Sequence, residues 1–215
     1  MNRAHVTYIP AFSAERMRLN ISPVIKWALR ETAIDSRLVN QGSVQKGQRV
    51  LDLGCGNATL TILIKKTQPD AEVVGIDEDK NVLEIAEIKS RKQNARIALF
   101  DAKAFDIPCR DNYFDRVFSS MLFHHLTTKD KIRAAEEVYR ILKPGGELHV
   151  ADFGMPQNAL MSLIARIRRK VEGVEDNIQG LLPHIMYAAD FKDIETTTEL
   201  ASMFGTISLL RAKKP

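Results

Sequence analysis

Cysteine and long apolar runs are both scarce in this chain. Its 215 residues include two cysteines, Cys55 and Cys109, with no Cys-x-x-Cys pair and no histidine spacing suited to a metal site. Charged side chains interrupt the apolar residues of positions 1–20, which excludes the continuous apolar core of a signal peptide. No run approaches the roughly 20 apolar residues of a membrane span. We therefore expect a soluble, cytoplasmic protein without disulfides and without a metal.

The composition is that of an ordinary globular chain. Apolar residues make up 45% and charged residues 27%, which excludes disordered, collagen-like and coiled-coil proteins. The 31 Lys and Arg residues exceed the 27 Asp and Glu residues only slightly, for a net charge of +4. So small an excess does not require a nucleic-acid partner. One domain over residues 1–215 can bury a sufficient apolar core.

Strand-like and helix-like segments alternate between residues 49 and 152. Strands are expected at 49–53, 72–76, 96–100, 114–120 and 147–152, and helices at 58–67, 80–92 and 128–142. Short strands separated by helices of this length predict a parallel sheet with helices on both faces. Two further strand-like segments, 191–197 and 206–211, have no helix between them and are expected to pair antiparallel. Additional helices are expected at 12–40, 158–171 and 181–189.

The most informative segment is residues 50–59, which read VLDLGCGNAT. A buried strand runs into a Gly-Cys-Gly turn and then directly into a helix. Glycine permits the sharp reversal and lets backbone approach a ligand, while the helix N-terminus offers free N–H groups. Asp77 ends the next strand, where a carboxylate can accept hydrogen bonds from two ribose hydroxyls. Both features fit a nucleoside-bearing cofactor, either NAD or S-adenosylmethionine.

Three observations separate these two cofactors. The dinucleotide fingerprint requires a third glycine or an alanine where this chain has Thr59. Asp52 stands two residues before the first glycine, and later segments read FDRVFSS at 114–120 and LKPGGEL at 142–148. Together these motifs resemble the class I S-adenosylmethionine-dependent methyltransferases, and the similarity covers roughly residues 48–153. It implies an α/β, Rossmann-like, doubly wound sheet of seven strands, mostly parallel, with a C-terminal antiparallel hairpin and a helical cap.

A narrower resemblance concerns one branch of that class. The segments FHHL at 123–126, ADFG at 151–154 and FGT at 204–206 resemble the ubiquinone/menaquinone-biosynthesis-type small-molecule methyltransferases. The implied organisation is an N-terminal helical cap (1–47), a cofactor-binding core (48–153), a helical insertion on the acceptor side (154–190) and C-terminal strands (191–215).

The resemblance assigns one set of residues to the methionine end of the cofactor. These are Asp52, Gly54, Cys55, Gly56, Ser119 and Ser120. The glycine turn would contribute backbone, Asp52 would hold the ammonium through water, and the two serines would face the reacting methyl group. Cys55 is interpreted as a small packing residue, not a nucleophile, and Cys109 is likewise not interpreted as one.

A second set would hold the nucleoside. Asp77 would accept the ribose hydroxyls, Glu78 would shape the adenine edge, and Asp101 with Ala102 would meet the adenine amino group. Phe100 precedes Asp101 where many relatives have glycine, which does not remove a polar contact. The alternative for Asp101 is a turn cap.

Two histidines are the candidate catalytic residues. His124 and His125 follow the fourth strand on the rim where the acceptor would sit, and histidine suits a general base if the acceptor arrives protonated. Adjacent side chains of an extended or loop segment point differently, so only one is expected to face the site. The alternative is that either histidine packs or caps. Tyr8 and Phe12 would close over the site or serve ordinary packing.

The acceptor is expected to be a small molecule. Residues 160–171 combine an apolar stripe with a basic side, which fits a lid or core helix. The alternative is that these residues form an apolar pocket, or a weak contact with a membrane surface, for a quinone-like or lipid-like acceptor. Residues 119–122 lack the Asn/Asp-Pro-Pro-aromatic element of base-modifying methyltransferases, so a nucleic-acid acceptor is not favoured.

The expected reaction is methyl transfer from S-adenosylmethionine, with S-adenosylhomocysteine as product. The alternatives are an NAD-dependent oxidoreductase and a catalytically silent S-adenosylmethionine-binding protein. Oligomeric state is left open.

Overall fold

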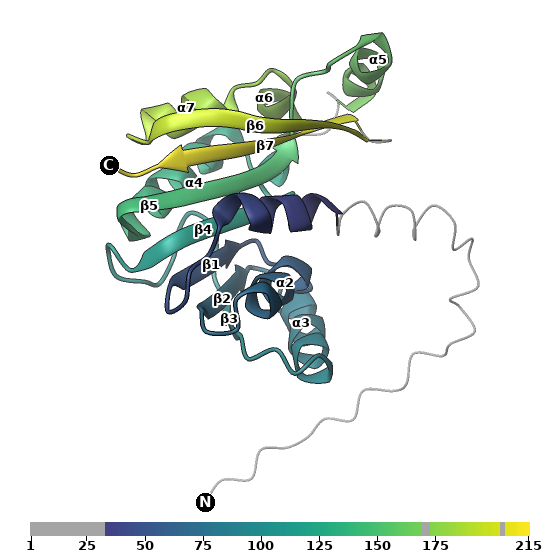
Figure 1. The fold of residues 1–215 in the computed structure, drawn as a ribbon. Helices are drawn as coiled ribbons and strands as arrows, with labels where there is room; N and C mark the ends of the chain where they lie inside the picture. Colours follow the sequence, from purple (N-terminus) through teal and green to yellow (C-terminus); the bar gives the residue numbers. More distant parts are fainter. Residues whose placement is uncertain (1–32, 169–172, 203–204) are drawn as a thin grey trace, which may run out of the picture.

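A computed structural model describes residues 33–168, 173–202 and 205–215 (Figure 1). The strands are β1 (Arg49–Leu53), β2 (Glu72–Asp77), β3 (Ala98–Asp101), β4 (Phe114–Ser120), β5 (Leu142–Phe153), β6 (Lys192–Ser202) and β7 (Gly205–Lys213). They form one sheet in the order β3-β2-β1-β4-β5-β7-β6. Neighbours among the first five strands pair parallel, whereas β7 is antiparallel to both β5 and β6. The predicted sheet with its C-terminal hairpin is confirmed.

Helices connect the strands and cover the sheet. They are residues 33–42, α2 (Thr59–Thr67), α3 (Lys80–Lys92), the 3₁₀ helix η2 (Phe123–His125), α4 (Thr128–Ile141), α5 (Ala159–Arg168), α6 (Val174–Ile178) and α7 (Leu182–Ala188). The predicted helices agree with these bounds within a few residues, except that residues 12–32 of the first and 169–171 of the helix predicted at 158–171 lie outside the described residues. η2 and α6 were not predicted. None of the described helices is long and apolar enough to cross a membrane.

Two apolar cores cover the two faces of the sheet. On β1, Val50 belongs to a core with Leu38 of the helical residues 33–42 and Leu60 of α2. The next residue, Leu51, belongs to the opposite core, which includes residues of α4 and α7 such as Met186. This alternation follows from the pleat of a strand, in which successive side chains point to opposite faces. Because both faces of the sheet are buried, its strands are held in place, and the side chains at the strand ends therefore have fixed positions.

β5 begins earlier than the sequence suggests. The Lys-Pro-Gly-Gly run was expected to separate a helix from a strand starting at residue 147, yet Leu142 already pairs with Phe114. The register then shifts, and the glycines pair with the end of the chain: Gly145 N–H donates to Lys214 O, and Lys214 N–H donates to Gly146 O. The hydrogen-bond partner of these two glycines is thus a C-terminal residue, which the local turn motif gives no means of predicting.

Candidate active site

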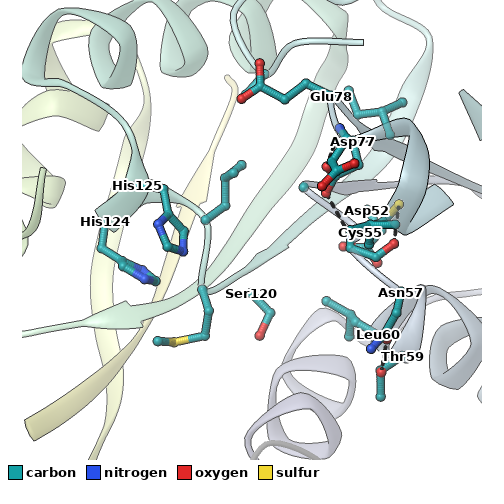
Figure 2. A pocket seen from close by; sticks show the side chains of 18 of the residues that line it. Asp52, Cys55, Asn57, Thr59, Leu60, Asp77, Glu78, Ser120, His124 and His125 are labelled. Atoms are coloured by element: carbon teal, nitrogen blue, oxygen red, sulfur yellow. Dashed lines mark hydrogen bonds between the residues drawn. The ribbon is translucent and has the colours of Figure 1, made fainter. Parts of the chain in front are cut away.

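A cavity of about 980 Å³ lies at the carboxyl ends of β1, β2, β4 and β5 (Figure 2). The strand order reverses between β1 and β4, the place where open α/β sheets bind ligands. The predicted site residues that line the cavity are Asp52, Gly54, Cys55, Gly56, Asp77, Glu78, Ala102, Ser120, His124 and His125. The sheet therefore brings most of the predicted residues to one hollow.

The glycine turn forms one wall of the cavity. The N–H groups of Gly54 and Cys55 both donate to Ile76 O at 2.9 Å, which ties the turn to β2. Gly54 and Gly56 have φ angles of +72° and +50°, a region that favours glycine. A Cβ on Gly54 would lie 2.7 Å from Leu122 Cδ1, whereas one on Gly56 would meet nothing closer than Val82 Cγ1 at 4.0 Å. The turn thus presents bare backbone with free space beside Gly56, as a closely approaching ligand requires.

Cys55 packs under this turn. Its Sγ would lie 2.9 Å from a Cβ on Gly75, so sulfur occupies the space that the missing side chain leaves. Burial, with the nearby charges of Asp52 and Asp77, raises the pKa of the thiol. A thiol that stays protonated is a poor nucleophile. This supports the interpretation of Cys55 as a packing residue.

Asp77 joins the turn to the second strand. Its Oδ2 accepts a hydrogen bond from Gly56 N–H at 2.9 Å, and its Oδ1 accepts one from Asp79 N–H at 3.0 Å. An ionised carboxylate has about four acceptor sites, so these two bonds leave capacity for hydroxyl groups of a ligand. Figure 2 shows Asp77 at the cavity wall with Glu78 beside it.

Two buried carboxylates lie deeper in the cavity. Asp52 Oδ2 accepts a bond from Thr61 Oγ1 at 2.6 Å, and Asp35 Oδ1 accepts one from Ser120 Oγ at 2.8 Å. Burial raises the pKa of Asp52 to about 7, opposed by the Thr61 hydrogen bond and assisted by the charge of Asp35. Asp35 is not among the site residues predicted from the sequence. Asp35 precedes the buried Leu38 by three residues, so helical periodicity places both side chains on the buried side of a helix. This spacing could have identified Asp35.

Comparison with known proteins places the chain in a family. A family model described as a methyltransferase domain matches residues 50–146. The demethylmenaquinone methyltransferase of Thermus thermophilus is 30% identical over 158 residues, covering 74% of this chain and 68% of that protein. The chain belongs to the menaquinone-type class I S-adenosylmethionine-dependent methyltransferases.

Other relatives match a smaller part of this methyltransferase. The demethylmenaquinone methyltransferase of Geobacillus is 37% identical over 116 residues, covering 53% of this chain and 49% of that protein. The chain spans about half the length of several curated relatives it matches. The structure of Haemonchus contortus phosphoethanolamine N-methyltransferase 2, in complex with phosphomonomethylethanolamine and S-adenosylhomocysteine, superposes with a TM-score of 0.66. At 20% identity, covering 87% of this chain and 52% of that one, this likeness concerns the fold alone.

Two predicted cofactor residues of the methyltransferase do not reach the cavity. Asp101 Oδ2 pairs instead with Lys80 Nζ at 3.1 Å, because it ends the edge strand β3 and its side chain is partly exposed. Ser119 is fully buried, and its hydroxyl donates to Leu53 O at 3.2 Å, because alternation along β4 sends it away from Ser120. The cofactor contacts of Asp101 and Ser119 therefore stay predictions, which the positions of these side chains do not support. The lining of the cavity also includes the apolar residues Val82, Ile85, Ala102, Ala104 and Phe105.

Both histidines of the methyltransferase line the cavity. Figure 2 shows them across the hollow from Asp52, Cys55 and Asp77. The expectation that only one would face the site is wrong, because they lie on the 3₁₀ helix η2, with ring centroids 4.0 Å apart. Burial and the neighbouring His124 lower the pKa of His125.

The segment expected to select the acceptor contributes little to the described cavity. No described residue of 154–190 lines it, whereas Phe153, Ser202 and Ile207 at the ends of β5, β6 and β7 do. The proposed division of the chain, including the acceptor role of 154–190, stays a prediction. Tyr8 and Phe12 lie outside the described residues.

Proposed function

We propose that this chain transfers a methyl group from S-adenosylmethionine to a small, apolar acceptor of the quinone type. The curated relatives reported above are demethylmenaquinone methyltransferases, which suggests the acceptor class. Apolar side chains on the histidine side of the cavity support it, including Leu122, Phe153 and Ile207. A flat, apolar ring would bury its surface against such residues.

The charge of the cavity is the observation that carries the cofactor assignment. Within the described part of the chain its lining includes no lysine or arginine, but it does include five carboxylates: Asp35, Asp52, Asp77, Glu78 and Asp79. S-adenosylmethionine carries a sulfonium and an ammonium against one carboxylate, so an acidic cavity attracts it. NAD carries a pyrophosphate, which the same charges repel. The charge therefore argues against the oxidoreductase alternative.

Different residues of the cavity would bind different parts of the cofactor. When bound, S-adenosylmethionine would supply a methyl group attached to a sulfonium sulfur. The sulfur needs no further activation, because it leaves as a neutral thioether. The turn at 54–56 would hold the methionine end by backbone, Asp77 the ribose, and Asp52 with Asp35 the ammonium. The remaining task is to bring the acceptor into line with the methyl group and to exclude water.

The test is label transfer combined with ligand-dependent stability. The protein is incubated with methyl-labelled S-adenosylmethionine and a chemically reduced demethylmenaquinone of short side chain. We expect label in the acceptor and one S-adenosylhomocysteine per methyl group transferred. S-adenosylhomocysteine at 100 times its dissociation constant should also stabilise the fold by about 2.7 kcal/mol, and NAD should not. Stabilisation by NAD alone would contradict the proposal, and cofactor binding without transfer to any acceptor of a broad panel would favour the silent alternative.

We also propose a weak contact between α5 and a lipid surface, which would help deliver an acceptor with a long apolar tail. Leu160 and Leu163 of α5 are 62% and 58% exposed, and Arg166 on the same helix is exposed. The sequence places four basic residues within 166–170. Figure 1 shows α5 at the end of the sheet where β5 finishes, the end at which the cavity lies. Apolar and basic residues together favour an anionic membrane surface.

Vesicle sedimentation tests this contact. With phosphatidylglycerol vesicles, we expect the double substitution Leu160→Ser and Leu163→Ser to lower the bound fraction several-fold. The matched control is Ile88→Ser on α3, which removes an apolar side chain that is 56% exposed on another helix. Equal binding of both variants and the unmodified protein would contradict the contact.

A further inference from the structure

Asp152 is a fully buried carboxylate at the end of β5, next to the cavity. Its Oδ1 accepts a hydrogen bond from Phe153 N–H at 2.7 Å and lies 2.9 Å from His124 Nδ1, and its Oδ2 accepts one from His124 N–H at 3.3 Å. An ionised carboxylate can only accept, so Nδ1 of His124 carries the hydrogen of this contact. The other ring nitrogen, Nε2, then has a free electron pair.

The His124 ring is held in place on several sides. It is 8% exposed and lines the cavity (Figure 2). The ring of Phe153 meets it edge-on, with centroids 4.8 Å apart, and the ring of His125 lies on another side. Asp152 fixes the rotation of the ring, so its tautomer and its direction are set together.

The backbone behind His124 is equally constrained. Gly173 lies so close that a Cβ on it would be 2.6 Å from His124 O. The buried Lys131 donates to Gly173 O and pairs with Asp176 Oδ2 at 3.0 Å, which anchors this contact to α4 and α6. A base held on rigid elements loses little entropy when it meets its substrate.

We propose that His124, oriented by Asp152, is the general base of the reaction, and that the acceptor therefore arrives with a hydroxyl proton, as a hydroquinone does. This inference rests on the proposed function. Nε2 takes the hydroxyl proton, and the electron pair released makes the acceptor nucleophilic. The acceptor forms its new bond to the methyl carbon as the carbon–sulfur bond breaks, and that pair stays on sulfur as a neutral thioether. The acceptor gains CH₃ and loses H⁺, which His124 passes to solvent.

The surrounding groups suit this cycle. Among residues 33–168, 173–202 and 205–215, the titratable side chains in contact with His124 are Asp152 and His125. Asp152 balances the charge that His124 gains, while the lowered pKa of His125 keeps that neighbour neutral. His124 is therefore assigned as the catalytic residue and Asp152 as a positioning residue.

Activity on two different acceptors distinguishes a general-base role of His124 from a purely structural one. One is the reduced short-chain demethylmenaquinone, whose hydroxyl is protonated at the assay pH. The other is a hydroxynaphthoquinone that is already ionised there. We expect His124→Gln to lower kcat about 100-fold on the first acceptor and no more than about threefold on the second. Asp152→Asn should lower kcat at least about tenfold on the first, because its amide can donate to Nδ1 and reverse the tautomer.

The matched control is His184→Gln, an exposed histidine of α7 outside the cavity, which should leave both activities unchanged. The affinity of His124→Gln and Asp152→Asn for S-adenosylhomocysteine should equal that of the unmodified protein, which shows that they fold. On the first acceptor, kcat of the unmodified protein should fall as the pH is lowered, and that of His124→Gln should change less. Equal losses on both acceptors at every pH would overturn the inference.

A tautomer measurement decides the inference separately from the proposed function. In ¹⁵N spectra of histidine-labelled protein, we expect His124 to carry hydrogen on Nδ1 and none on Nε2, and Asp152→Asn to change this pattern. Hydrogen on Nε2 of His124 in the unmodified protein would overturn the assigned base even if methyl transfer occurs. Absence of label transfer to both acceptors would instead contradict the proposed function.

Discussion

Replacing Asp77 with asparagine is expected to weaken S-adenosylhomocysteine binding by about 10- to 100-fold without unfolding the protein. Hydrogen bonds to a charged group contribute about 1.5–3 kcal/mol, and asparagine removes the charge that two ribose hydroxyls would meet. Asparagine keeps a carbonyl oxygen that can accept from Gly56 N–H, which Asp77 now does at 2.9 Å. Alanine would remove that bond as well and loosen the turn, so asparagine isolates the contribution of the ligand contact.

Titration calorimetry measures this effect, and Asp101→Asn is its matched control. Asp101 ends the neighbouring strand but pairs with Lys80 outside the cavity, so its substitution should leave the affinity unchanged. Unchanged affinity in Asp77→Asn would remove Asp77 from the site. A loss in Asp101→Asn as large as that in Asp77→Asn would support the adenine contact predicted for Asp101.

The fold could be predicted because its signals are local and repeated. Strand and helix periods alternate through the core, and the bounds of β1, β4 and α3 agree with the prediction residue for residue. The positions of the glycine turn and of Asp77 at the cavity could be predicted for the same reason. Each directly follows or ends a strand that the local sequence pattern already identifies. The early start of β5 could not, because its partners lie at the end of the chain.

The parts of the site that were missed depend on side-chain direction and on distant contacts. Ser119 and Ser120 are neighbours in sequence, yet only Ser120 faces the cavity. Asp35 comes from a helix before the core, and Asp152 acts through a contact with His124, 28 residues away. Nothing in the local pattern distinguishes such carboxylates from solvated ones. Tertiary packing gives them their roles.

Cofactor binding is expected to strengthen about tenfold as the pH rises from about 6 to about 8. Burial raises the pKa of Asp52 to about 7, so in the free protein Asp52 is largely protonated at the lower pH. An ammonium placed beside it favours the carboxylate, so binding releases this proton, and the cost of releasing it falls as the pH rises. S-adenosylhomocysteine retains the ammonium and is a suitable probe. Affinity that does not change with pH would contradict the predicted contact.

Asp52→Asn should abolish this pH dependence and bind more weakly at pH 8. Calorimetry in two buffers of different ionisation enthalpy should detect proton release in the unmodified protein and little in the variant. The stability of the free protein should depend on the same raised pKa of Asp52. A carboxyl whose folded pKa lies above its unfolded value of 3.8 contributes stability that is present below that value and is lost as the pH rises to about 7. The free Asp52→Asn variant should therefore lose less stability than the unmodified protein between pH 4 and pH 7, because asparagine has no proton to release in the unfolded chain.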